Sequence, residues 1–90
     1  MALKRVIPIT NIRGLHARAS RKFAELSLSF QSRIIVRRED EEADGRSLMD
    51  LMMLGAGCGS EIEVEVQGED EAAAMEAIAA LLEAKFHEGE

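Results

Sequence analysis

The chain has 90 residues, a net charge of −6, no tryptophan and no tyrosine. A chain of this length predicts one domain, over residues 1–90, and its acidity argues against a nucleic-acid-binding protein. The single cysteine, Cys58, excludes an internal disulfide and a zinc finger. The start lacks the apolar core of a signal peptide, and no apolar run is long enough to span a membrane. These features predict a cytoplasmic protein without nucleic-acid or membrane partners.

The sequence opens with a strand pattern that is followed by a helix pattern. In an extended segment, Leu3, Ile7 and Ile9 would lie on one side, expected to face inward, and Lys4, Val6 and Pro8 on the other. Pro8 cannot donate a ladder hydrogen bond and therefore predicts a sheet edge. Asn11 to Gly14 predicts a turn. After the turn, apolar residues recur at helical spacing and form one stripe: Ala19, Phe23, Leu26 and Phe30.

The middle of the chain predicts two strands and a short helix. Residues 31–38 alternate in hydropathy as a strand does, and the acidic run 39–44 predicts a turn that leads into a charged edge strand. Residues 47–54 predict a short helix. Ser47 and Asp50 have the spacing of a capping box in an acidic variant.

The last third predicts one strand and one helix. Residues 61–66 alternate strictly between glutamate and aliphatic residues, and Asp70 is expected to cap the helix that follows. The buried stripe of that helix is expected to be Met75, Ile78, Ala79, Leu82 and Phe86.

The order β-α-β-β-α-β-α predicts the fold class. We expect an α+β open-faced β-sandwich, in which a four-stranded antiparallel sheet carries three helices on one face. The other face is exposed and is expected to hold weak cross-strand ion pairs. The residues expected in these pairs are Glu61, Glu63 and Glu65 on one side and Lys4, Arg33 and Arg37 on the other.

The segment Gly14-Leu15-His16-Ala17-Arg18 carries the clearest chemistry in the sequence. His16 falls where the turn meets the helix, and free N–H groups and the positive dipole end of a helix favour an anion there. Arg18 offers a planar fork to phosphate oxygens. Because neutral imidazole is a nucleophile near neutral pH, these residues predict a covalent phosphoryl site. An exposed loop histidine without a function is the alternative.

Two segments resemble the HPr family of phosphocarrier proteins. Gly14 to Arg18 is similar to the active-site signature of that family, and Arg46 to Gly55 is similar to its regulatory-serine region. The resemblance extends over essentially the whole chain. It implies that His16 takes a phosphoryl group on Nδ1 from Enzyme I and passes it to a histidine of a IIA protein, with Arg18 supporting the group. Ser47 is implied to be a substrate of an HPr kinase/phosphorylase.

A partner-binding patch is expected on the short helix at residues 47–54. Its apolar residues lie nearly all round it, and one face must be exposed in a two-layer fold. Leu51 and Leu54 are expected in the core. The residues expected to bind partner proteins are Leu48, Met49, Met52 and Arg21. A core position for the apolar residues and a solvated helix face for the arginine are the alternatives.

The sequence departs from the family at Ala19-Ser20, where the family usually has Pro and then Ala. Pro suits a first helical turn, and Ala19 still permits a helix. The departure leans towards the nitrogen-related branch of the phosphotransferase system, while the choice between that branch and sugar uptake stays open. We expect a monomeric carrier rather than an enzyme, with no cofactor and no metal.

Two other classes of function stay open at this point. A small regulatory ligand-binding domain of similar build would need a pocket but neither His16 nor Arg18. A regulatory interaction module would use the methionine-rich patch and control its partners through its phosphorylation state.

Overall fold

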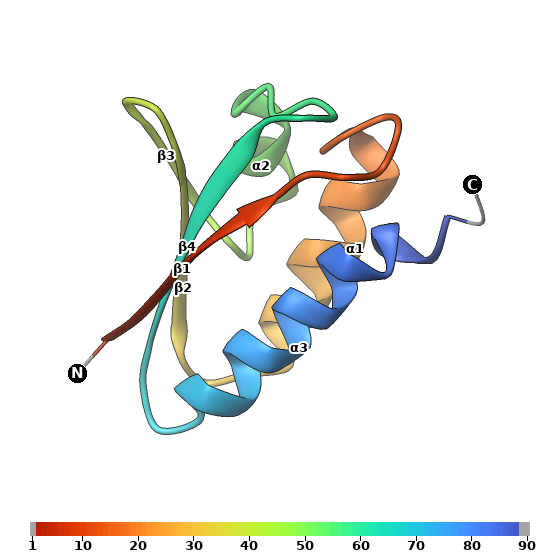
Figure 1. Cartoon of the computed structure of the whole chain (residues 1–90). Helices are drawn as coiled ribbons and strands as arrows, with labels where there is room; N and C mark the ends of the chain where they lie inside the picture. Colours follow the sequence, from red (N-terminus) through yellow and green to blue (C-terminus); the bar gives the residue numbers. More distant parts are fainter. Residues whose placement is uncertain (1, 89–90) are drawn as a thin grey trace.

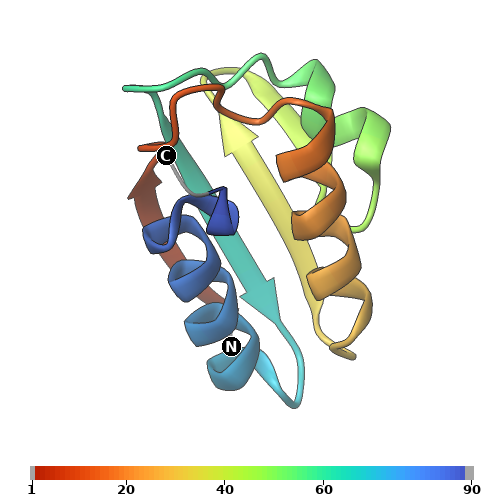
Figure 2. The ribbon, with the colours of Figure 1, turned by 90° about the vertical axis from the view of Figure 1, so that its right-hand side faces the viewer.

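The computed structural model describes residues 2–88, which form one sheet with three helices on one of its faces (Figure 1). The strands are β1 (Ala2–Pro8), β2 (Arg33–Arg38), β3 (Glu41–Asp44) and β4 (Glu61–Gln67). The helices are α1 (Ala17–Leu28), α2 (Leu48–Met53) and α3 (Glu71–Glu83), and a short 3-10 turn, η1 (Lys85–His87), follows α3. Figure 2 shows α1 and α3 side by side across the sheet. The predicted element order and open-faced sandwich are confirmed.

The sheet is antiparallel throughout and has the strand order β1-β4-β2-β3. The strands β1 and β3 lie at its edges, as Pro8 and the acidic run 39–44 predicted. In register, Ile7 lies opposite Ile62 and Val36 opposite Val64. This alternation directs the aliphatic side chains of three strands towards the helices.

The core lies between the sheet and the helices. Its largest fully buried apolar side chains are Phe23, Phe86, Ile9, Ile34, Leu51, Ile62, Ile78, Leu82, Val36, Val64 and Val66. Burying each one contributes about 1.5–3 kcal/mol relative to leaving it in water. Leu3 is an exception to the predicted inward side of β1, because it lies at the start of an edge strand and remains 38% exposed.

Charged residues on the open face are linked mainly through Arg37. Its guanidinium donates to Glu65 at 2.6 Å, Glu42 at 2.8 Å and Glu63 at 3.1 Å. The hydrogen bond from Arg37 lowers the pKa of Glu65. The charges of Lys4 and Arg33 lower this pKa further, by a smaller amount. Of the three cations that were predicted to pair with these glutamates, Arg37 is therefore the one that makes the hydrogen bonds described here.

The first of two cap predictions holds in part. Ser47 is the N-cap of α2, and its Oγ accepts the Asp50 N–H at 3.2 Å. The Asp50 carboxylate does not close the box, since it accepts the N–H of Asp44 at 3.2 Å, while the N–H of Ser47 donates to the Asp44 carbonyl. Asp is one methylene shorter than the Glu of the usual box, and the end of β3 offers it a nearer donor.

The second cap prediction is right about the position of Asp70 and wrong about its hydrogen bonds. Asp70 holds the N-cap position of α3, but its side chain makes no hydrogen bond to that helix. The carboxylate instead accepts the N–H groups of Gln31 and Ser32, each at 2.9 Å, and the Ser32 hydroxyl. The loop between α1 and β2 presents these unpaired donors, so Asp70 links that loop to the start of α3.

Candidate functional site

The turn before α1 is held against the glycine-rich loop 55–59. Gly14 has φ +64°, and a Cβ added there would lie 2.4 Å from the Ala56 carbonyl oxygen. The N–H of Leu15 donates to the same oxygen at 2.8 Å. Only glycine allows both this backbone conformation and this close approach, so Gly14 determines where the next residues of the turn lie.

His16 is the N-cap of α1, at the junction where the sequence placed it. Its backbone carbonyl accepts the N–H of Ser20 at 2.9 Å, which begins the helix. Its ring Nδ1 accepts the N–H of Arg18 at 3.3 Å. Ala19 lies fully buried within the helix, so the residue that replaces the family's proline does permit the helix, as expected.

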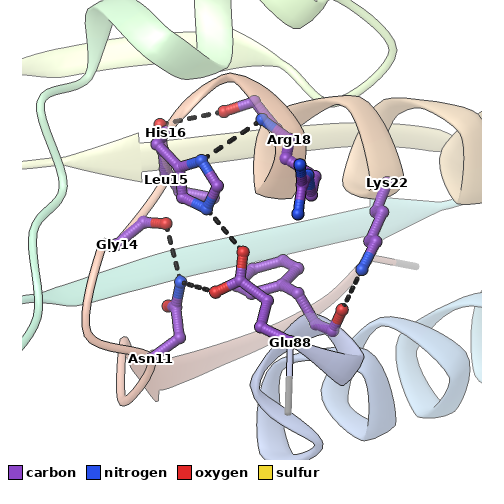
Figure 3. Close-up of polar contacts among 9 residues, drawn as sticks. Asn11, Gly14, Leu15, His16, Arg18, Lys22 and Glu88 are labelled. Atoms are coloured by element: carbon purple, nitrogen blue, oxygen red, sulfur yellow. Dashed lines mark hydrogen bonds and ion pairs between the residues drawn. The ribbon is translucent and has the colours of Figure 1, made fainter. Parts of the chain in front are cut away.

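Glu88 lies against the other nitrogen of the same ring (Figure 3). Its Oε2 is 2.5 Å from His16 Nε2, and its Oε1 accepts from Asn11 Nδ2 at 3.0 Å. Asn11 Nδ2 also donates to the Gly14 carbonyl at 2.8 Å. Burial raises the pKa of Glu88, but hydrogen bonds from Asn11 and His16 and the charges of His16 and Lys22 outweigh burial, so the pKa lies below its ordinary value.

Sequence reasoning did not identify Glu88 or Asn11. Glu88 is 72 residues from His16 in the chain, and it follows the last helical stripe in a segment without hydropathy periodicity. Asn11 was interpreted only as a turn residue. No local pattern signals either contact.

An open cleft lies beside the histidine ring. It is lined by Ile12, Arg13, His16, Arg18 and Glu88. Two arginines and the first turn of α1 supply positive charge and N–H donors at this cleft. The arrangement suits an anion of phosphate size in contact with the ring.

The predicted patch on α2 divides as the sequence indicated. Leu51 and Leu54 are buried, whereas Leu48, Met49 and Met52 are 36%, 65% and 40% exposed. Figure 2 places α2 beside the beginning of α1. Exposed Met53 and Ile12 also add apolar surface at this end of the molecule, and the sequence analysis did not include them.

Arg21 and Cys58 are exposed. Arg21 forms an ion pair with Glu25 one turn along α1, at 3.2 Å, as on a solvated helix face. Cys58 lies in the glycine-rich loop with Sγ 3.9 Å from the Thr10 carbonyl oxygen. These contacts assign no chemistry to either residue, and partner binding by Arg21 stays a prediction.

Two kinds of feature are absent from residues 2–88. No group of three or more His, Cys, Asp or Glu side chains in this range could hold a metal ion. Nor does the described part of the chain contain a helix of the length and hydropathy that crossing a bilayer requires.

Comparison with protein families gives a match over most of the chain. Residues 3–84 match the family model described as "PTS HPr component phosphorylation site". The chain is 48% identical to the phosphocarrier protein HPr of Neisseria meningitidis serogroup B over 88 residues, which cover 98% of this chain and 99% of that protein. It is 41% identical to the phosphocarrier protein NPr of Shewanella violacea over 86 residues, or 96% of this chain and 94% of that one.

Solved structures show the same similarity. HPr-C-His from Thermoanaerobacter tengcongensis superimposes with a TM-score of 0.92 at 34% identity, covering 96% of this chain and 97% of that chain. The phosphocarrier protein HPr from Bacillus anthracis gives 0.86 at 27% identity, covering 90% and 96%. The fold and the sequence comparisons therefore agree.

Proposed function

The chain belongs to the HPr family of phosphocarrier proteins of the phosphotransferase system, and from this premise we propose that it accepts a phosphoryl group on His16 from phospho-Enzyme I and passes it to a histidine of a IIA protein. A family member of this kind carries the group and is not itself a catalytic enzyme. One observation carries the assignment to His16: its Nδ1 lies at the first turn of α1 next to Arg18, beside a cleft lined by two arginines.

The geometry supports an in-line transfer to Nδ1. The lone pair of Nδ1 forms the new bond to phosphorus while the bond between phosphorus and the donor atom of Enzyme I breaks, and its electrons return to the donor. The N–H of Arg18 is 3.3 Å from Nδ1, a long hydrogen bond that costs little to give up. Once released, this N–H can donate to a phosphoryl oxygen, together with the Arg18 guanidinium.

Onward transfer is the same step in reverse. The IIA histidine attacks the phosphorus, and the electrons of the Nδ1–P bond return to His16. Because donor and acceptor are both imidazoles in this step, the chain must hold the group without stabilising it strongly. An exposed guanidinium and a helix end satisfy this requirement, since their interactions are partly screened by water.

Intact-mass analysis tests the carrier role directly. After incubation with Enzyme I, Mg²⁺ and phosphoenolpyruvate, the wild type should gain one acid-labile phosphate, and the His16→Ala variant should gain none. The Arg18→Ala variant should gain it more slowly. A wild type that stays unmodified by the Enzyme I of its own host, when that Enzyme I phosphorylates another carrier, would overturn the proposal.

Ser47 is proposed as a second, regulatory phosphorylation site for an HPr kinase/phosphorylase. Its hydroxyl caps α2, next to the exposed Leu48, Met49 and Met52. A phosphate there would be compatible with the helix N-terminus but would place negative charge beside an apolar docking patch. We infer that this patch and Arg21 contact Enzyme I and IIA proteins.

The location, assembly and branch of the system are also part of the proposal. We place the exchange in the cytoplasm, with the chain as a monomer, which light scattering on a sizing column can test. Relatives named HPr and relatives named NPr both match, so the comparisons do not choose between sugar uptake and the nitrogen-related branch. Measuring transfer to IIA proteins of each branch would decide.

A further inference from the structure

The end of the described chain forms a turn with an unusual backbone. Lys85, Phe86 and His87 have φ values of 54°, 57° and 56°, in the left-handed region that bulky L-residues rarely adopt. Two contacts hold this C-terminal turn (residues 85–88): the Phe86 side chain is fully buried, and Lys22 Nζ donates to the Phe86 carbonyl oxygen. A disfavoured conformation persists when its surroundings determine it in this way, and such turns gather at functional sites.

The turn delivers a carboxylate to the histidine. Figure 3 shows Glu88 reaching back from the C-terminal turn to lie between Asn11 and His16. The side chains of His16 and Glu88 are only 22% and 10% exposed. Water therefore screens this pair less than it screens the ion pairs elsewhere on the surface.

We propose that Glu88 is a positioning residue for His16: its carboxylate fixes the proton on Nε2, leaves the Nδ1 lone pair free, and balances the positive charge of the phosphorylated ring. This inference rests on the proposed function of His16. A carboxylate whose pKa lies below its ordinary value is an acceptor only. The backbone N–H of Arg18 donates to Nδ1, so Nδ1 carries no hydrogen in this geometry. The ring hydrogen is then on Nε2, where it faces the Glu88 carboxylate at 2.5 Å.

The charge balance of the transfer explains the second role. When neutral imidazole forms the Nδ1–P bond, no proton leaves and the ring becomes a cation. The other charged groups near it are cationic: Arg13 and Arg18 line the cleft, and Lys22 lies close enough to affect Glu88. Among the described residues that line the cleft, Glu88 supplies the carboxylate. Without Glu88, the phosphoryl oxygens would be the acceptors left to balance the charge of the ring, and they are also the acceptors for Arg18.

Glu88 lies outside the stretch that the family model matches, which ends at residue 84. The family match therefore assigns no role to Glu88. Asn11 supports the contact from the turn before α1, and Lys22 supports it from the second turn of α1. Asn11 and His16 contact the carboxylate itself, and Lys22 holds the turn that carries it through the Phe86 carbonyl oxygen, as expected for a built contact rather than a loose surface ion pair.

The hydrogen bond is tested by NMR on the unphosphorylated chain, so this test does not depend on the carrier role. At about pH 8, where free imidazole is neutral, the wild type should show a downfield His16 Hε2 that exchanges slowly with water. Glu88→Ala should lose this signal, and Glu88→Gln should keep a weaker one. The control Glu83→Gln removes an equal charge from an exposed position on the last turn of α3 and should match the wild type. A wild-type signal in Glu88→Ala would overturn the contact.

The charge role is tested by the phosphoryl exchange equilibrium with Enzyme I. Glu88→Gln should shift it about tenfold away from the phosphorylated carrier, because the hydrogen bond that remains no longer has a charged acceptor, while Glu83→Gln should leave it unchanged. An unshifted equilibrium in Glu88→Gln would overturn the charge role. If the wild type takes no phosphate at all, the proposed function fails, and the NMR result still decides the contact.

Discussion

Gly14 is the residue on which the position of His16 depends most directly. Its φ of +64° and the backbone of Ala56 and Gly57 beside it leave no space for a side chain. Gly55 has the same φ of +64° but has no neighbouring atom within 4 Å of an added Cβ. The two glycines therefore separate the effect of backbone strain from the effect of close packing.

Gly14→Ala is expected to destabilise the protein more than Gly55→Ala does. Left-handed strain alone costs about 1–2 kcal/mol, and the overlap at Gly14 adds about 1–3 kcal/mol. Urea denaturation followed by circular dichroism measures both values. Gly14→Ala should also slow phosphorylation of His16, whereas Gly55→Ala should not. Equal losses of stability in the two variants would show that the turn moves away freely from the glycine-rich loop.

Two substitutions at Ser47 separate the effect of the helix cap on stability from the effect of added charge on partner binding. Ser47→Ala removes the acceptor for the Asp50 N–H and should lower the free energy of unfolding by about 1 kcal/mol. Ser47→Asp keeps a cap acceptor and should cost little stability, yet it should weaken binding to Enzyme I, because the charge lies beside the exposed methionines. Calorimetric titration with Enzyme I measures the affinity. Unchanged binding by Ser47→Asp would rule out regulation by charge at this position.

At the scale of elements, one carboxylate links two parts of the chain that are distant in sequence. Asp70, at the start of α3, accepts hydrogen bonds from Gln31 and Ser32 in the loop between α1 and β2. The hydrogen bond from the Ser32 side chain, followed by that from the Gln31 backbone, lowers the pKa of Asp70. Ser32 is itself 1% exposed, so protonation of Asp70 would weaken a partly buried junction.

This junction predicts a loss of stability in acid. A group whose pKa is lower in the folded state stabilises the fold above its unfolded-state pKa, about 3.9 for Asp, and loses that contribution as the pH falls through the folded value. Thermal unfolding should therefore show a melting temperature that falls below about pH 4. Asp70→Asn should melt lower than the wild type at neutral pH and approach it in acid. The control Glu69→Gln changes an exposed neighbour and should show the same melting temperatures as the wild type at each pH. If the difference in melting temperature between Asp70→Asn and the wild type stayed constant with pH, the linkage would be contradicted.

The junction also shows what the sequence could predict about elements. Strict alternation identified the strand at 61–66, and helical spacing identified part of the buried face of α1 and most of that of α3, because both signals are local. The predicted stripes ran too far, since Phe30 lies after the end of α1 and Phe86 lies in the turn after α3. The partners of Asp50 and Asp70 were wrong in the prediction because a carboxylate at a helix start bonds to the nearest free donor. Here those donors come from the end of β3 and from the loop after α1, which only the tertiary fold brings close.

At the scale of the whole molecule, the site lies where several loops meet at one end of the two layers. The turn before α1, the glycine-rich loop and the C-terminal turn all contact the surroundings of His16. The histidine and the arginine were predictable because they lie together in one short segment. Glu88 was not, because its approach depends on how α3 packs and on the left-handed turn that follows it.

This dependence predicts that the turn carrying Glu88 opens only when the core unfolds, because the Phe86 side chain ties the turn to the core. Phe86 in the C-terminal turn and Phe23 in the middle of α1 are both fully buried, so each Phe→Ala change should cost about 3–5 kcal/mol. Urea denaturation measures both, and Phe23→Ala is the matched control for core loss away from the turn. If Phe86→Ala costs less than about 1 kcal/mol while Phe23→Ala shows the full loss, the C-terminal turn opens independently of the fold. Glu88 would then reach His16 only in the closed form, and its effect on the phosphorylated ring would be limited by the population of that form.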